Sequence, residues 1–177
     1  MTLQATTSQT VGPYLHIGLT WLIIENLARA GVPGERVSIQ GCIVDGEGKP
    51  VDDAAVEIWQ ADAKGKYGQK GFRGFGRSAT DAKGRFRFKT IKPGRVPGPD
   101  AKLQAPHIAV NIFMRGQLKQ LVSRIYFPDD PANGGDPVLA LVPAKRRHTL
   151  IARKTKSGSL DWNIVLQGKD ETVFFDC

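Results

Sequence analysis

Short stretches of alternating apolar and polar residues constrain the fold of this chain more than any other feature. In the clearest stretch, at 37–44, Val37, Ile39, Gly41 and Ile43 alternate with a set that includes Ser38. Further stretches that read as strands lie at 56–59, 86–88, 108–114, 118–127 and 160–166, and 172–175 is a candidate for one more. Because successive side chains of a strand point to opposite faces, this period of two predicts short strands that bury one face.

Turns and loops separate the predicted strands at regular intervals. The chain has 20 glycines and 11 prolines, many of them at the ends of apolar stretches. They lie in turns at 45–48, 81–84 and 92–94 and in loops at 95–104 and 128–137, while 145–152 reads as a short helix or an irregular segment. This spacing predicts an all-β fold, an antiparallel β-sandwich. We expect one domain over 1–177, with an N-terminal arm and interface segment at 1–35 and the sandwich at 36–177.

The charge of the chain is basic, with a formal net charge of +8. Lys and Arg are spread along the sequence and are densest at 145–156, which indicates a solvated face or a subunit contact. No recognition helix, zinc finger or aromatic RNA-binding pattern accompanies the charge, so we expect no nucleic-acid partner. The apolar stretch at 15–27 is short and is interrupted by His16 and Glu25, so we expect no membrane span.

Cysteine content and the N-terminal residues predict the compartment. Cys42 and Cys177 are the two cysteines, and they form no metal-type spacing. So few cysteines in a chain of this length favour free thiols over a disulfide framework. Residues 1–9 contain no Lys or Arg and so lack the charged start of a secretory signal. We therefore expect a cytoplasmic protein.

The residue types that most often carry chemistry are few. The chain has three histidines and three tyrosines, among which Tyr67 and His107 lie near predicted strands, and His16 and His148 lie in unrelated contexts. A lone His or Tyr on a strand is usually a half-buried side chain with a satisfied hydrogen bond. Spacing alone therefore designates no catalytic site in this sequence.

Several motifs together resemble the intradiol aromatic-ring dioxygenase family. They are SQTVGPY at 8–14, GCIVD at 41–45, AVEIWQAD at 55–62, GRSATDAKGRF at 76–86, TIKPG at 90–94 and TVFF at 172–175. The similarity extends over nearly the whole chain, and it implies a sandwich of the intradiol dioxygenase type. The family holds ferric iron with two Tyr and two His, and a His-x-His pair puts two imidazoles on one face of a strand.

The resemblance also implies which ligands this chain has and lacks. Tyr67 matches the first Tyr ligand and His107 matches the first His ligand. Val96 occupies the position of the second Tyr, and Ala109 occupies that of the second His. Gln104 stands where the iron-bearing subunit has an Arg. Since two of four ligands are missing, we expect no metal and no catalytic residue in this chain alone.

By the same resemblance, the chain is the iron-less subunit of a hetero-oligomer. Its expected partner is a homologous, iron-bearing beta subunit that supplies Fe(III), and the substrates are O₂ and a small aromatic carboxylate, 3,4-dihydroxybenzoate. The product would be 3-carboxy-cis,cis-muconate. The resemblance implies that Thr10, Gly12 and Pro13 line a substrate pocket at the subunit boundary. Arg124 is a candidate to face the substrate carboxylate or to order the interface, because Arg binds carboxylates through paired hydrogen bonds.

Two other functions fit parts of the sequence. One is a self-sufficient intradiol dioxygenase that acts on another catechol, which the side chains of Val96 and Ala109 disfavour. The other is a non-enzymatic β-sandwich binding module, because sandwiches carry many unrelated functions.

Overall fold

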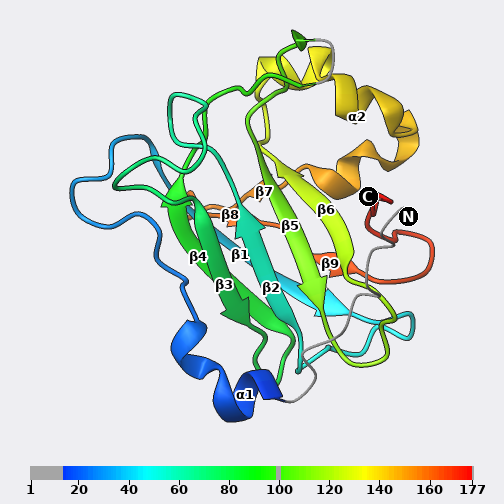
Figure 1. Ribbon diagram of the computed structural model, residues 1–177. Helices are drawn as coiled ribbons and strands as arrows, with labels where there is room; N and C mark the ends of the chain where they lie inside the picture. The colour runs from blue at the N-terminus through cyan, green and yellow to red at the C-terminus, as the bar shows by residue number, and fades with distance from the viewer. Residues whose placement is uncertain (1–13, 99–100, 177) are drawn as a thin grey trace, which may run out of the picture.

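The computed structural model describes residues 14–98 and 101–176, and strands dominate these residues (Figure 1). The strands are β1 Arg36–Val44, β2 Ala55–Trp59, β3 Phe75–Ala79, β4 Arg85–Ile91, β5 His107–Phe113, β6 Leu121–Tyr126, β7 Arg153–Lys154, β8 Leu160–Asp161 and β9 Ile164–Val165. The helices are short: α1 Tyr14–Gly18, η1 Thr20–Leu22, η3 Pro131–Gly135, α2 Pro137–Leu141 and η4 Ala144–Leu150. None of the helices in this part of the chain is both long and apolar enough to cross a membrane.

The strands form two sheets that face each other, as predicted (Figure 1). One sheet has the order β4-β1-β8-β7, with β9 also paired to β1, and the other has the order β3-β2-β5-β6. Strand β5 is paired on both sides, antiparallel to β2 and to β6. The described residues therefore confirm the predicted β-sandwich.

The core between the sheets consists of the inward side chains of the alternating stretches. Ile39 and Ile43 of β1 and Phe88 of β4 meet Ile108 and Ile112 of β5, and each of these side chains is at most 1% exposed. Burying an aliphatic or Phe side chain contributes about 1.5–3 kcal/mol. The same alternation leaves every second residue of β5 on the outer face of its sheet, where the candidate site lies.

The last part of the first sheet differs from the predicted antiparallel arrangement. Strands β8 and β9 run parallel to β1, and they replace the single predicted strand at 160–166. Between them the backbone N–H of Trp162 donates to the Gln40 carbonyl at 2.9 Å, and the backbone N–H of Cys42 donates to Asn163 Oδ1 at 2.9 Å. Trp162 is buried and lies between β8 and β9, where it interrupts the single strand that the sequence predicted at 160–166.

Other boundaries also differ from the sequence-based expectation. Strand β3 was not predicted, and β6 begins at Leu121 instead of 118. The segment 145–152, expected as a short helix or an irregular segment, is mostly the short 3-10 helix η4. The candidate strand at 172–175 contributes only an isolated bridge between Phe175 and Val122. These segments are short, and tertiary contacts decide their structure more than local pattern does.

A second, smaller core lies on the outer face of β6. The ring of Tyr126 is fully buried there against Leu139 and Val142 of the α2 region and Leu150 of η4. In Figure 1 these helices lie beside β6. This second core covers the beginning of β5, because Ala105 belongs to the same cluster.

Gly41 gives a direct test of the close approach between β1 and the Trp162 segment. A Cβ added at Gly41 would lie 1.9 Å from the Trp162 carbonyl oxygen, so the backbone would have to shift. We predict that Gly41→Ala lowers the free energy of unfolding by roughly 2 kcal/mol, within the range for overpacked sites. The matched control is Ser38→Ala on the exposed face of the same strand, with a change below about 0.5 kcal/mol. Urea denaturation of both variants measures the difference, and equal stabilities would contradict this packing.

Candidate functional site

The four metal-site positions and Arg124 lie on β5, on its neighbour β6 and in the loops around them. Antiparallel pairing puts Ala109 directly opposite Trp59 of β2 on one side and Arg124 of β6 on the other. His107, two residues earlier on the same face, is opposite Tyr126. Directly opposed residues in a sheet have Cβ atoms about 5 Å apart, so these side chains are immediate neighbours.

His107 is buried and has one ring nitrogen engaged. Its ring is 5% exposed and lies 5.8 Å from the Tyr126 ring, centroid to centroid. The Nδ1 atom is 2.8 Å from the Ala105 carbonyl oxygen. A carbonyl only accepts hydrogen bonds, so Nδ1 carries a proton and a neutral ring keeps its lone pair on Nε2. Burial lowers the pKa of His107, and the positive charge of Arg124 lowers it further.

Tyr67 reaches the same region from a tight loop that precedes β3. Asp62 Oδ1 accepts from the backbone N–H of Lys64 at 2.9 Å and of Lys66 at 2.8 Å, which reverses the chain before Tyr67. The phenol ring stacks on Trp59 with centroids 5.9 Å apart and planes 10° apart. Burial raises the pKa of Tyr67, and the nearby charge of Arg124 opposes that rise.

The other two ligand positions offer no ligand atoms. Val96 lies in the loop before β5, where its carbonyl oxygen accepts from the backbone N–H of Gln104 at 2.9 Å. Its isopropyl side chain is buried, with the residue 5% exposed. Ala109 carries only a methyl group. Within 14–98 and 101–176, no group of three or more His, Cys, Asp or Glu side chains converges to hold a metal ion. The residues present do not fit the Tyr₂His₂ ferric site of the family.

Arg124 of β6 lies directly opposite Ala109. Its Nη1 donates to Gln104 Oε1 at 2.5 Å, and its guanidinium carbon lies 5.8 Å from the centre of the Phe175 ring. Gln104 is held in turn, because its Nε2 donates to the Pro97 carbonyl at 3.2 Å. Arg124 therefore connects β6 with the loop that carries Val96.

Asp136, which the sequence analysis did not single out, holds this region in place. Its buried carboxylate accepts from the Ala105 N–H at 2.7 Å and from the Tyr126 hydroxyl at 3.1 Å. It also caps α2 by accepting from two backbone N–H groups at the helix start. Burial and the Asp136 charge raise the pKa of Tyr126 well above its usual range. Asp136 followed by Pro137 is a helix-start pattern that could have indicated the cap, but not its contacts with β5 and β6.

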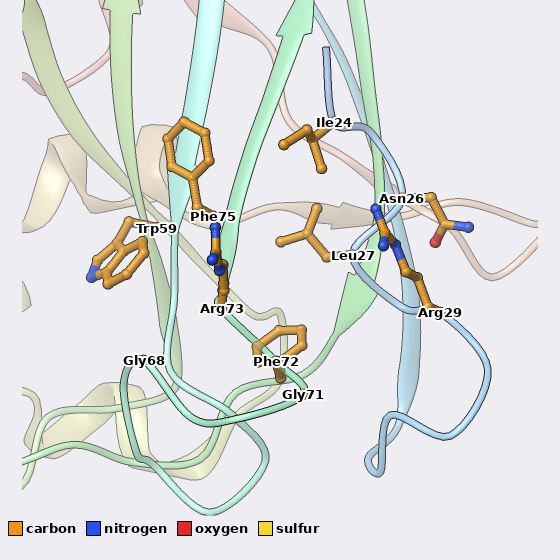
Figure 2. A pocket seen from close by; sticks show the side chains of 11 residues that line it. Ile24, Asn26, Leu27, Arg29, Trp59, Gly68, Gly71, Phe72, Arg73 and Phe75 are labelled. Carbon is orange, nitrogen blue, oxygen red and sulfur yellow. The ribbon is translucent and has the colours of Figure 1, made fainter. Parts of the chain in front are cut away.

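The three remaining candidates, Thr10, Gly12 and Pro13, lie outside the described residues. A cavity of about 710 Å³ lies beside Trp59, and it includes none of the four metal-site positions. In Figure 2, Trp59 and Phe75 lie on one side of this cavity and Ile24 and Leu27 on the other, with Arg73 between them. Trp59 connects the two places, because it lines the cavity and also lies against Tyr67 and opposite Ala109.

Comparison with known proteins agrees with this geometry. A family model described as Dioxygenase matches residues 24–168. The protocatechuate 3,4-dioxygenase alpha chain of Burkholderia cepacia is 41% identical and aligns with 99% of this chain and 98% of its own length. The beta chain of that dioxygenase from the same organism is 38% identical, with 85% of this chain and 72% of the beta chain covered.

A solved structure is also similar. The dioxygenase domain of a carbohydrate-binding fusion protein from Streptomyces sp. SirexAA-E has a TM-score of 0.67 and 28% identity, and the match covers 83% of this chain and 89% of that domain. The family match, the full-length relatives and the sandwich with its altered ligand positions lead to one conclusion. This chain belongs to the intradiol ring-cleavage dioxygenase family.

Proposed function

We propose that this chain is the non-iron-binding alpha subunit of a protocatechuate 3,4-dioxygenase. The observation that carries the proposal is the combination of full-length likeness to alpha chains with side chains that cannot bind iron at two of the four ligand positions. Val96 and Ala109 offer no oxygen or nitrogen donor from their side chains. A hard ferric ion prefers anionic oxygen and imidazole ligands, and Tyr67 and His107 alone would leave most of its coordination to water.

The partner in this proposal is a homologous beta subunit that holds Fe(III). The 38% identity to a beta chain supports a complex of two related sandwiches. Exposed side chains at the start of the described chain suit a subunit contact, because Ile17 is 77% exposed and Trp21 is 76% exposed. Apolar groups of this size are enriched at obligate interfaces, which often bury more than about 2,000 Å².

The complex is proposed to cleave 3,4-dihydroxybenzoate between its two hydroxyl-bearing carbons. Both atoms of O₂ enter the product, 3-carboxy-cis,cis-muconate, so no external reductant is needed. The bound iron supplies activation of the catecholate toward O₂, and the proteins orient the substrate and exclude water. The reaction belongs to the cytoplasmic catabolism of aromatic compounds.

This chain is proposed to contribute to the pocket through its N-terminal arm. Gly12 permits close backbone approach to a substrate ring, and Pro13 restricts the direction of the chain. Arg124 was a candidate for the same pocket or for the interface. Its guanidinium is already bonded to Gln104 and lies against Phe175, which favours an ordering role within this subunit.

The first test of the proposal concerns metal binding. We predict that the chain expressed alone and exposed to ferric iron retains much less than one iron per chain, because Val96 and Ala109 supply no ligand. Elemental analysis after gel filtration measures the content, and an absorption spectrum reports any phenolate-to-iron charge transfer. A red-brown protein with stoichiometric iron would refute the non-iron-binding subunit.

The second test concerns the N-terminal arm within the intact complex. Thr10→Ala removes one hydroxyl without changing the backbone, and it should cost about 1 kcal/mol of transition-state stabilisation if that hydroxyl binds a partner. Gly12→Val should raise KM or lower kcat while iron content and assembly stay intact. Thr7→Ala in the same arm is the control and should keep wild-type kinetics. Unchanged steady-state kinetics in both Thr10→Ala and Gly12→Val would place the arm away from the substrate.

A further inference from the structure

The cavity of about 710 Å³ beside Trp59 has two walls that the backbone holds in place. One wall is aromatic, because Trp59 of β2 and Phe75 of β3 are directly opposed in the antiparallel register. The other wall carries Ile24 and Leu27 (Figure 2). Ile24 exchanges backbone hydrogen bonds of 2.8 and 3.0 Å with β3, and the Leu27 N–H donates to a carbonyl of β4 at 2.8 Å. Both walls are therefore formed by the sheets themselves.

The lining of this cavity combines an apolar interior with a cationic rim. Leu27 and Phe72 are buried and belong to the main core. Trp59 also lines the cavity but is 41% exposed, so much of its indole is available for contact. The polar part of the rim includes the exposed residues Arg29 and Arg73, and the lining contains no Asp or Glu. A cavity with this lining attracts an anion that carries an apolar group.

The two arginines of the rim have no acidic partner in the protein. The ion pairs within 14–98 and 101–176 include neither Arg29 nor Arg73. Arg77, on the neighbouring strand β3, differs because its guanidinium is bonded to Glu57. In Figure 2, Arg73 lies between the two walls. Its guanidinium can therefore form paired hydrogen bonds with a carboxylate whose ring lies in the cavity.

We propose that this cavity binds a small aromatic carboxylate, with the ring against Trp59 and the carboxylate on Arg73. The volume is within the range of about 300–1,000 Å³ that small-molecule sites occupy. An indole and a planar ring gain from stacked or edge-to-face contact. None of the four metal-site positions lines the cavity, so the site is separate from them and the inference does not depend on the proposed function.

The first experiment compares three ligands by calorimetry on the full chain. The probe is 2-naphthoate, beside 2-naphthalenemethanol, which has the same rings without the charge, and cyclohexanecarboxylate, which has the charge without an aromatic ring. We expect one naphthoate per chain with a Kd below about 1 mM, and binding at least about tenfold weaker for the other two. Equal affinity for naphthoate and the neutral alcohol, or no binding of naphthoate, would overturn the inference.

Variants of the same chain test the two contacts separately. Arg73→Gln should weaken naphthoate binding by at least about tenfold, and Arg73→Lys should have a smaller effect because it keeps the charge but loses the planar fork. Trp59→Leu should weaken binding while keeping an apolar side chain. The matched control is Arg153→Gln, which removes the same charge from an exposed position on the other sheet. Equal losses in Arg73→Gln and Arg153→Gln would show an effect of net charge and would refute the site.

Crystallography locates the ligand in the assembled protein. Crystals of the chain purified with its partner are soaked in 6-bromo-2-naphthoate, and the anomalous signal of bromine marks each bound molecule. We expect a peak between Trp59 and Leu27 of this chain. Bromine peaks only at other places would overturn the inference. A side chain of the partner that fills this cavity would also overturn it, because the cavity would then be a protein contact.

Discussion

The pairing register of β5 between β2 and β6 is the constraint on which the rest of the site depends. It places Trp59, Ala109 and Arg124 in one row and His107 opposite Tyr126 in the adjacent row. A slip of one residue would turn all these side chains into the core and bring Ile108 and Val110 to the outer face. The inward isoleucines of β5, which are fully buried between the sheets, therefore determine where the outer residues lie. Asp136 also supports this register, because its one carboxylate binds Ala105 two residues before β5, Tyr126 of β6 and the start of α2.

The same scaffold explains how a chain of this family can keep the fold while the residues at the family's ligand positions change. The sandwich core holds the sheets together through apolar contacts, so the outer face of β5 is free to change its chemistry. Here the face keeps one Tyr and one His, and a hydrogen-bonded Arg lies beside them. The side chains of Val96 and Ala109 carry no oxygen or nitrogen atom that could bind a metal. A chain of this family can therefore retain the fold while the residues on this face change.

Much of the fold could be predicted from the sequence because its strands alternate cleanly and end at Gly and Pro. The parallel pairing of β8 and β9 with β1 could not, because it depends on Gly41 accommodating the Trp162 carbonyl, a contact between residues far apart in the chain. Within the site, the family motifs assigned Tyr67, Val96, His107 and Ala109 to the ligand positions, and that assignment stays a prediction. The contacts of Arg124 with Gln104 and of Asp136 with Tyr126 join separate loops and strands, and no local pattern encodes them.

The central claim is that this chain is the subunit of the complex that binds no iron and that its homologous partner binds it. Anomalous diffraction at the iron absorption edge, from crystals of the complex purified with its partner, tests this claim most directly. The account predicts one strong anomalous peak at each beta chain and none near Tyr67 and His107 of this chain. An iron peak between Tyr67 and His107 of this chain, comparable in height to those of the partner, would contradict the account.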